Sequence, residues 1–310
     1  MTDNNKALFP RTAIIGVGLI GSSLALALRE QKLTDDIIGV DQSADVLARA
    51  KKLGVIDTAE GTLASGVKDA DLIVLSTPVG AAKELCASLA EHAKDGAVII
   101  DVGSIKGAVA DAASSLPERL YFVPSHPVAG TEQSGPEAGF PSLFKDRWCI
   151  LTPLERQDAP YLDAVEKVKT LWQGVGADIE VMDAAHHDLA LAVTSHLPHL
   201  IAFTLVGAAD DLESVTQAEI VKYSAGGFRD FTRIAASNPV MWRDVFLNNR
   251  EAVIEALGRF TEELTALQRA IRWGDGEALH KAFERGRDLR KAIVDAGQET
   301  AAPNFGRDES

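Results

Sequence analysis

Three glycines and one aspartate stand at the spacing that binds a dinucleotide. Gly16, Gly18 and Gly21 follow the apolar run TAII and precede a stretch of helical periodicity, and Asp41 stands twenty residues after Gly21. In this pattern the first glycine permits a tight turn, and the second lets the backbone approach a pyrophosphate. The third lets the helix pack close to the strand. The segment therefore predicts a dinucleotide site of the Rossmann type.

The residues around this turn indicate which dinucleotide is bound. Leu19 and Ile20 open the expected helix, so their main-chain amides can face the phosphates. A carboxylate at Asp41 would accept hydrogen bonds from the ribose hydroxyls and repel a 2′-phosphate. Gln42 and Ser43 follow it, where an enzyme for the phosphorylated cofactor would carry arginines. We expect NAD in preference to NADP.

Two polar loops follow apolar runs further along the chain. Ser76, Thr77 and Pro78 end one run, and the segment Asp101–Ser104 ends the next. Ligands of open parallel sheets lie outside the carboxyl ends of the strands, so both loops should meet the nicotinamide half of the cofactor. Thr77 is expected to be a cofactor contact rather than a catalyst.

Histidines and arginines that could act on an anionic substrate are concentrated in three motifs. The motifs are SHPVAGTEQSG with His126, AHHDLALAVTSHLPHL with His186, His187, His196 and His199, and GGFRDFTRIAASNPVMWRD with Arg229, Arg233 and Arg243. A neutral imidazole can accept a proton near neutral pH, and a guanidinium binds a carboxylate through two hydrogen bonds. The net charge of −14 makes clustered arginines informative, because an anion needs a locally positive site.

Short apolar runs alternate with amphipathic stretches through the first half of the chain. The expected strands are Thr12–Gly16, Ile37–Asp41, Asp71–Thr77, Ala97–Val102, Tyr121–Pro124, Trp148–Leu151 and Asp178–Val181. Runs such as LIVLS and AVIID are apolar throughout, as in a parallel sheet covered on both faces. The pattern predicts an α/β fold with a doubly wound sheet, with helices such as Leu19–Glu30 and Ala81–His92 between the strands.

Strand patterns stop near residue 182, and the rest reads as helices. One long helix is expected over Asp183–Ala209, interrupted near Pro198, and a second over Val240–Ala270. A last helix is expected over Glu277–Ala296. We therefore predict a dinucleotide-binding domain over 1–182 and an all-α domain for substrate and dimerisation over 183–310.

Composition excludes several classes of protein. The acidic net charge disfavours nucleic acid and anionic membrane surfaces as partners, and no apolar run approaches the length of a membrane span. The polar start MTDNNKALFPR lacks the apolar core of a secretion signal, so a cytoplasmic location is expected. Cys86 and Cys149 are expected to be reduced, buried thiols rather than metal ligands.

The motifs together resemble those of the prephenate/arogenate dehydrogenase family of tyrosine biosynthesis. The resemblance rests on GVGLIGSSLA, DVGSIKG, SHPVAGTEQSG, HHDLALAVTSHLPH and GGFRDFTRIAASNPVMWRD, and it covers roughly residues 10–295. It implies NAD-dependent oxidative decarboxylation of prephenate to 4-hydroxyphenylpyruvate by a homodimer that associates through its helical domain. Arogenate, alone or as a second substrate, is the alternative.

The resemblance assigns roles to individual residues. His126 matches the catalytic histidine, which takes the proton of the substrate hydroxyl, and Ser104 matches the partner that hydrogen-bonds the same hydroxyl. The remaining matches concern substrate binding: His196 at the side-chain region, Arg233 on a carboxylate, Arg229 in a secondary electrostatic role, Thr131 through its hydroxyl or amide, and Trp242 as a wall of the pocket.

Other residues of these motifs have plainer interpretations. His187 and Asp188 are expected to form only an interaction in the opening turn of a helix, and His199 is expected to be structural. Arg243 is expected to pair with Asp244 or Asp230. Trp242 fits the core as well as a pocket.

Two other functions need to be weighed. A β-hydroxyacid dehydrogenase would need a catalytic lysine followed one turn later by asparagine, and Lys222 has no such asparagine after it. A non-catalytic NAD sensor would not need the combination of His126, Ser104 and Arg233. Between prephenate and arogenate, an ammonium would require a nearby acid, which Glu132 or Asp230 could supply, and prephenate is favoured.

Overall fold

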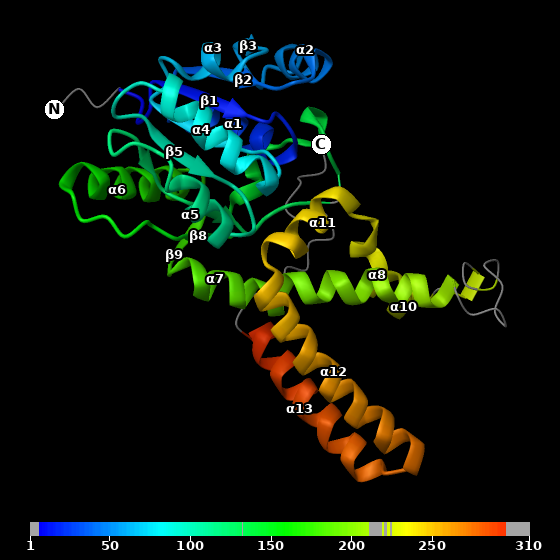
Figure 1. The fold of residues 1–310 in the computed structure, drawn as a ribbon. Coiled ribbons are helices and arrows are strands. Elements are labelled where there is room, and N and C mark those ends of the chain that lie inside the picture. Colours follow the sequence, from blue (N-terminus) through cyan, green and yellow to red (C-terminus); the bar gives the residue numbers. More distant parts are fainter. Residues whose placement is uncertain (1–5, 132, 211–218, 220–221, 224, 296–310) are drawn as a thin grey trace.

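The sheet that carries the glycine turn is parallel throughout. The computed structural model describes residues 6–131, 133–210, 219, 222–223 and 225–295. Six strands lie in the order β3-β2-β1-β4-β5-β6, which is the Rossmann order (Figure 1). Their bounds are β1 Arg11–Ile15, β2 Asp36–Val40, β3 Thr58–Glu60, β4 Leu72–Leu75, β5 Val98–Asp101 and β6 Tyr121–Phe122. The predicted α/β class is confirmed.

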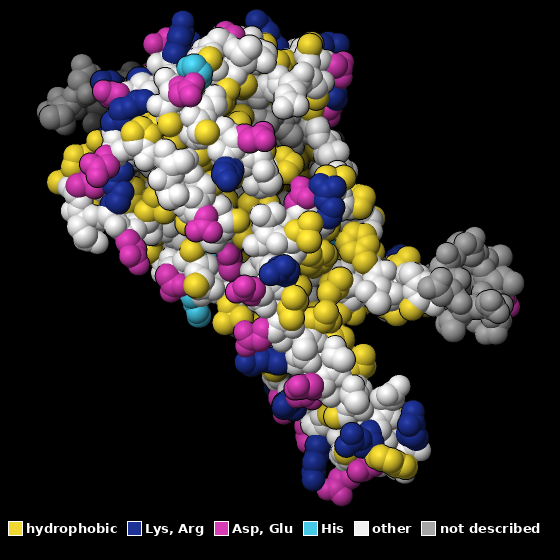
Figure 2. Space-filling view, viewed as in Figure 1, with side chains coloured by type: hydrophobic (Ala, Val, Ile, Leu, Met, Phe, Trp, Pro, Cys, Tyr) yellow, Lys and Arg dark blue, Asp and Glu magenta, His cyan; other side chains and the backbone are white. Residues whose placement is uncertain are grey.

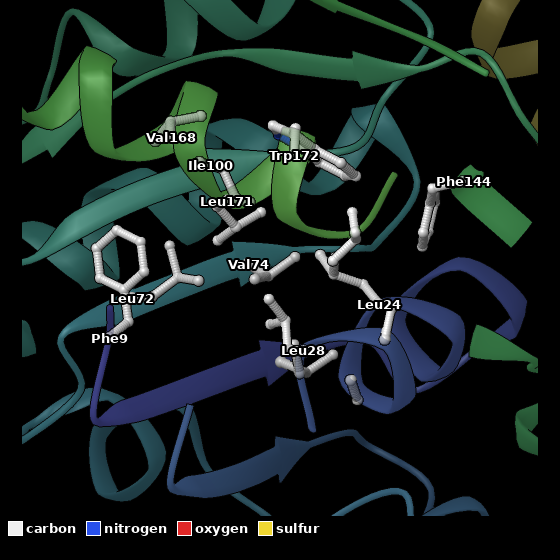
Figure 3. Packing of buried hydrophobic residues seen from close by; sticks show 14 of the residues in the cluster. Phe9, Leu24, Leu28, Leu72, Val74, Ile100, Phe144, Val168, Leu171 and Trp172 are labelled. Carbon is white, nitrogen blue, oxygen red and sulfur yellow. The ribbon is translucent and has the colours of Figure 1, made fainter. Parts of the chain in front are cut away.

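Helices cover both faces of this sheet because its strands are apolar on both sides. The helices are α1 Leu19–Glu30, α2 Ala44–Lys52, α3 Leu63–Val67, α4 Ala82–His92, α5 Gly107–Ala113 and α6 Ala159–Gly174. On one face, Leu24 and Leu28 of α1 pack with Leu171 and Trp172 of α6 against Val74 of the sheet (Figure 3). Helices α3, α4 and α5 fill the other face. Such packing fixes the carboxyl edge of the sheet rigidly.

A second, smaller sheet follows the first. Strands β7 Ser125–Pro127, β8 Trp148–Leu151 and β9 Asp178–Val181 pair in that order, β7 and β8 antiparallel and β8 and β9 parallel. These strands form a separate sheet because the chain leaves the first sheet after β6. Strands β3 and β7 were not predicted, since three residues are too few to show a period.

One long helical element begins the C-terminal part. Helix α7 (Ala184–Leu191) continues through a π-helical turn (Ala192–His196) into α8 (Leu197–Asp210). The predicted interruption near Pro198 is thus a π turn that ends two residues before the proline, where a proline ring is accommodated without a break in the element.

The predicted helix Val240–Ala270 is divided in two. Helix α11 (Pro239–Asn248) starts at Asn238, whose side chain accepts the amides of Val240 and Met241. It ends at Asn249, and α12 (Arg250–Trp273) follows. The continuous helix was therefore wrong. Asn249 leaves helical geometry, and its buried side-chain amide bonds to Asp188 and His196 instead.

The remaining helices are short or extended into a projecting arm. Helix α10 (Gly226–Thr232) and a short 3₁₀ turn (Arg233–Ala236) precede α11. Helices α12 and α13 (Gly276–Asp295) form an antiparallel hairpin that projects away from the sheet domain (Figure 1). Gly274 joins them in left-handed geometry, with φ +68°, as helix C-caps require.

The element made of α7, the π turn and α8 is unusually apolar for its exposure. By length and composition alone, Ala184–Ala209 could cross a membrane, with a mean hydropathy of 1.7 in its most apolar window. This corrects the expectation that no stretch is long enough, because serine, threonine and histidine interrupt the run without lowering its mean below that of a span. Only 28% of that window is buried within one chain.

Candidate active site

The glycine turn has the shape that a bound dinucleotide requires. Gly16 adopts φ +90°, and a Cβ there would lie 2.4 Å from the carbonyl oxygen of Ser76. A Cβ on Gly21 would lie 2.3 Å from the carbonyl oxygen of Gly16, whereas one on Gly18 would meet nothing within 4 Å. Gly16 and Gly21 therefore serve the fold, and Gly18 leaves open space for a ligand. The first turn of α1 carries no acidic side chain that would oppose a phosphate.

Asp41 follows β2 and closes the other side of this space. Its carboxylate accepts the main-chain amides of Val17, at 3.2 Å, and Ser43, at 2.9 Å. These bonds fix the carboxylate beside the glycine turn while leaving lone pairs for further donors, such as ribose hydroxyls. These residues fit the pyrophosphate and ribose of a dinucleotide.

The loops after β4 and β5 meet at the same edge. The main-chain amide of Ser76 bonds to Ile15, and a small hollow is lined by residues including Thr77, Pro78, Asp101 and Gly103. Ser104 follows Gly103, and the next residue, Ile105, is buried against Trp242 of α11. The loop that carries Ser104 therefore joins the sheet domain to the helical domain.

His126 lies at this junction, on β7. Its Nδ1 atom is 2.8 Å from Nε2 of His187 on α7, and Nδ1 of His187 is 2.8 Å from Oδ1 of Asp188. The two rings meet edge to face, with centroids 5.0 Å apart. Burial, followed by electrostatic interactions with His187 and Lys106, holds the pKa of His126 well below its ordinary value. At neutral pH the imidazole of His126 is thus uncharged and can accept a proton.

Asp188 is an anchored carboxylate. Besides His187, it accepts the main-chain amides of Lys106 and Gly107, both at 2.8 Å, and so ties α7 to the start of α5. Burial alone would raise its pKa, but the hydrogen bonds from His187 and from both amides outweigh this, and the pKa of Asp188 is lowered. The carboxylate is therefore ionised and accepts hydrogen bonds only.

A buried ion pair, Lys106 and Asp101, is hydrogen-bonded to the strand that carries His126. The Nζ atom of Lys106, fully buried, lies 2.5 Å from Asp101 and 2.7 Å from the carbonyl oxygen of Ser125. Asp101 also accepts the main-chain amide of Ser125. Burial lowers the pKa of Lys106, and Asp101 opposes that shift. The pair clamps the residue before His126 to the end of β5.

His196, from the π turn, is fully buried and held on one side only. Its Nδ1 atom lies 3.1 Å from Nδ2 of Asn249, which also donates to the main-chain oxygen of Asp188 at 2.8 Å. Because the Asn249 amide donates, Nδ1 of His196 accepts and its proton lies on Nε2. Among the described residues Nε2 has no hydrogen-bond partner, although it is buried. Burial lowers the pKa of His196 to about 4, so this donor is uncharged.

Trp242 and His199 form one wall. The two rings are stacked with centroids 3.7 Å apart, and His196 meets the edge of the same indole at 6.1 Å. Nδ1 of His199 donates to the carbonyl oxygen of Ser195. Burial lowers the pKa of His199, the hydrogen bond to Ser195 opposes that shift, and the positive charge of Arg233 adds to it, so Arg233 lies within electrostatic reach of the wall. Trp242 is 6% exposed and serves the core as well.

The other residues predicted for the site are less closely gathered. Arg229 is exposed and pairs with Asp230 at 3.4 Å. Thr131 is half-buried in the loop after β7, where its hydroxyl accepts the amide of Gln133. Glu132 lies outside the described residues. Arg243 bonds to Asp244, one of the two partners expected for it.

The sequence pointed to His126 and His196 but not to the groups that hold them. The His187–Asp188 interaction exists on the helix as expected, but it is buried and reaches His126 in the other domain. Lys106 and Asn249 were also missed. The signal for Lys106 was its place in DVGSIKG beside the predicted sheet edge, whereas nothing in the sequence marks Asn249.

Two family descriptions together match most of the chain. The family description "Prephenate dehydrogenase, nucleotide-binding domain" matches residues 24–181, and "Prephenate dehydrogenase, dimerization domain" matches residues 183–285. A cyclohexadienyl dehydrogenase of Zymomonas mobilis is 40% identical, over 92% of this chain and 97% of its own length. A prephenate dehydrogenase of Bacillus subtilis is 36% identical over 94% of this chain and 78% of its own.

Solved structures of prephenate and arogenate dehydrogenases are similar to this chain over most of its length. Prephenate dehydrogenase from Aquifex aeolicus, in complex with hydroxyphenyl propionate and NAD⁺, has a TM-score of 0.83 and 35% identity, covering 91% of this chain and 98% of its own. Synechocystis arogenate dehydrogenase has a TM-score of 0.74 and 28% identity, covering 91% of this chain and 99% of its own.

Proposed function

The chain belongs to the prephenate dehydrogenase family, and we propose that the junction around His126 carries out NAD-dependent oxidative decarboxylation of prephenate to 4-hydroxyphenylpyruvate. The observation that carries this proposal is the place of His126. It is an uncharged imidazole, buried at the cofactor edge of the sheet domain and bonded to a histidine of the helical domain. The protein is an oxidoreductase, and its cofactor is NAD.

The reaction needs few groups from the protein. When bound, NAD⁺ would supply the acceptor for the hydride of ring carbon C4 of prephenate. The C4 hydroxyl loses its proton to His126, and Ser104 is proposed to hydrogen-bond the same oxygen. The electron pair of the bond to the ring carboxylate enters the ring as CO₂ leaves, which makes the ring aromatic. The cofactor side is proposed to be formed by Gly16 and Gly21, which shape the turn, and by residues that contact the cofactor: Gly18, Leu19, Ile20, Asp41, Ser76, Thr77 and Pro78.

Substrate binding is assigned to the helical domain and the loop after β7. We propose that the unpartnered Nε2–H of His196 donates to the pyruvyl arm and that Arg233 pairs with a carboxylate. Arg229 adds positive charge, Thr131 contacts the substrate, and Trp242 forms a wall. His199, stacked on Trp242, is added to these residues.

The uncharged state of His196 favours prephenate over arogenate. A neutral N–H donates well to a keto oxygen but has nothing to offer an ammonium, which would need an acceptor. Of the two acids expected to be able to serve an ammonium, Asp230 is exposed and already pairs with Arg229, and Glu132 lies outside the described residues. Prephenate is thus the better fit.

Association and location complete the proposal. We propose a homodimer formed through the helical domain, with units over 1–182 and 183–310, in the cytoplasm. Apolar side chains gather on the surface where α8, α11 and the start of α12 meet (Figure 2). Exposed members there and along the arm include Leu247, Ile254, Ile271 and Trp273. A second chain, rather than lipid, would cover them and the poorly buried α8.

The direct test is to mix the protein with prephenate and NAD⁺. We expect NADH absorbance to rise with one CO₂ released per NADH, and kcat/KM to be higher with prephenate than with arogenate. No NADH with either substrate would refute the function. A higher kcat/KM with arogenate would refute the substrate preference alone.

A further inference from the structure

The hydrogen bonds around His126 form a chain with a single direction. Asp188 can only accept, because its carboxylate is ionised and already receives the amides of Lys106 and Gly107. Nδ1 of His187 must therefore donate to Asp188. In a neutral imidazole the other nitrogen is then an acceptor, so Nε2 of His187 accepts from Nδ1 of His126.

His187 is fully buried between His126 and Asp188, and each of its ring nitrogens has one partner. The main-chain amide of Lys106 bonds to the same carboxylate as His187, and the Lys106 ammonium bonds to the carbonyl oxygen of Ser125, on the strand of His126. A second cation in this space would be disfavoured by burial and by repulsion from Lys106. Asp101 balances the lysine, and Asp188 remains as a hydrogen-bond acceptor.

We propose that His187 and Asp188 are positioning residues that fix the tautomer of His126, with the proton on Nδ1 and the lone pair on Nε2. Nε2 is then the atom that receives the substrate hydroxyl proton. No proton has to move along the chain during the reaction, because Nδ1–H of the resulting imidazolium already donates to His187. This inference rests on the proposed role of His126 as proton acceptor.

The chain reaches both histidines of the site through one residue. The side chain of Asp188 orders His187 and His126, and its main-chain oxygen holds Asn249, which orders His196. The Nε2 atoms of the two histidines end in opposite protonation states. His126 is left with a lone pair on Nε2, and His196 is left with a proton on Nε2. One acid thus makes one imidazole an acceptor and the other a donor.

The tautomer can be measured without turnover. Protein labelled with ¹⁵N in its seven histidines gives separate resonances for protonated and unprotonated ring nitrogens, and loss of one set in His126→Asn assigns that residue. We expect a proton on Nδ1 of His126 near neutral pH. A proton on Nε2, or an equal mixture of tautomers, would overturn the proposal.

Two substitutions of His187 separate positioning from packing. Glutamine at position 187 keeps the direction of both hydrogen bonds. Because Asp188 only accepts, the amide NH₂ faces Asp188 and the amide oxygen accepts from His126. Leucine removes both bonds. We expect His187→Leu to lower kcat by roughly 10- to 100-fold, a share of the ~10²–10⁴ of general-base catalysis, with KM little changed. His187→Gln should restore most of that loss.

His186→Leu is the matched control, because its imidazole is exposed one position earlier on the same helix. Its kcat should equal that of the native chain. Equal losses in His187→Leu and His187→Gln would refute the positioning role. If either variant fails to fold, the tautomer in the native protein still decides. If the protein turns over prephenate but the proton of His126 lies on Nε2, only this inference is refuted. If the proton lies on Nδ1 but there is no turnover, only the proposed function is refuted.

Discussion

The side-chain amide of Asn249 donates to Nδ1 of His196 across 3.1 Å, and this bond leaves the buried Nε2–H of His196 for a ligand. Replacing His196 by leucine removes that donor and fills the same buried position with an apolar side chain. We expect KM for prephenate to rise roughly tenfold or more, which corresponds to the ~1–3 kcal/mol of a buried hydrogen bond left unmade. Steady-state kinetics check this, and an unchanged KM would remove His196 from the substrate site.

His126→Asn removes the proton acceptor but keeps a polar side chain of similar width. We expect kcat to fall by ~10²–10⁴-fold, with little change in the dissociation constant of NAD, because the glycine turn and Asp41 are untouched. Stopped assays for kcat and titration calorimetry with NAD measure the two quantities. Retained turnover would exclude His126 as the acceptor.

The pH dependence of kcat/KM follows from the environment of His126. Burial, then His187, Lys106 and His196, hold its pKa well below the ordinary value. The acceptor must be unprotonated, so activity is present above the lowered pKa and lost as the pH falls through it. We expect kcat/KM to stay nearly level from pH 7 to pH 6. An acid limb with a midpoint at or above 6.5 would contradict the shift.

Arg233 and Arg243 form a matched pair for the carboxylate contact. Arg233 lies within electrostatic reach of His199, whereas Arg243 is bonded to Asp244. Arg233→Ala should raise KM for prephenate by roughly 10- to 100-fold, as expected for loss of ~1.5–3 kcal/mol from a charged hydrogen bond. Arg243→Ala should leave KM within about twofold. Similar effects in both variants would indicate a general loss of positive charge.

Two substitutions in the glycine turn, Gly18→Ala and Gly21→Ala, are expected to have different effects. A methyl group on Gly18 meets open space, so Gly18→Ala should fold normally but bind NAD more weakly, because the methyl occupies the path of the pyrophosphate. Gly21→Ala places its methyl 2.3 Å from the carbonyl oxygen of Gly16. It should destabilise the fold by about 1–3 kcal/mol, measured by urea unfolding. Weakened NAD binding with full stability in Gly21→Ala would reverse these roles.

The sequence predicted the sheet well because its signals are local. Beta strands β8 and β9 were predicted at their observed bounds, and helix α1 was too, since each is a run of residues whose period can be counted. Asn249 could not be anticipated in the same way. Its neighbours continue a helical pattern, and the reason for the break is the hydrogen bond to Asp188, 61 residues away in sequence.

In the site, too, residues in local motifs could be predicted, whereas contacts between distant residues could not. His126 and Arg233 stand in recognisable motifs, but the bond from His126 to His187 joins residues from two domains. A histidine followed by aspartate near a helix start is common in surface turns, so the pair alone predicted nothing about burial. Only the packing of α7 against α5 turns that pair into part of the site.

The π turn sets the angular phase of the two histidines that Asp188 connects. His187 and His196 are nine residues apart, which in a uniform α-helix would place them about half a turn from each other. A π turn takes up about one extra residue, so the angle between them falls to about a quarter of a turn. The bulge between Ala192 and His196 thus acts as a one-residue phase shift. In a lineage of such chains, an insertion or deletion within those five positions would rotate one histidine out of register while leaving every residue type in place.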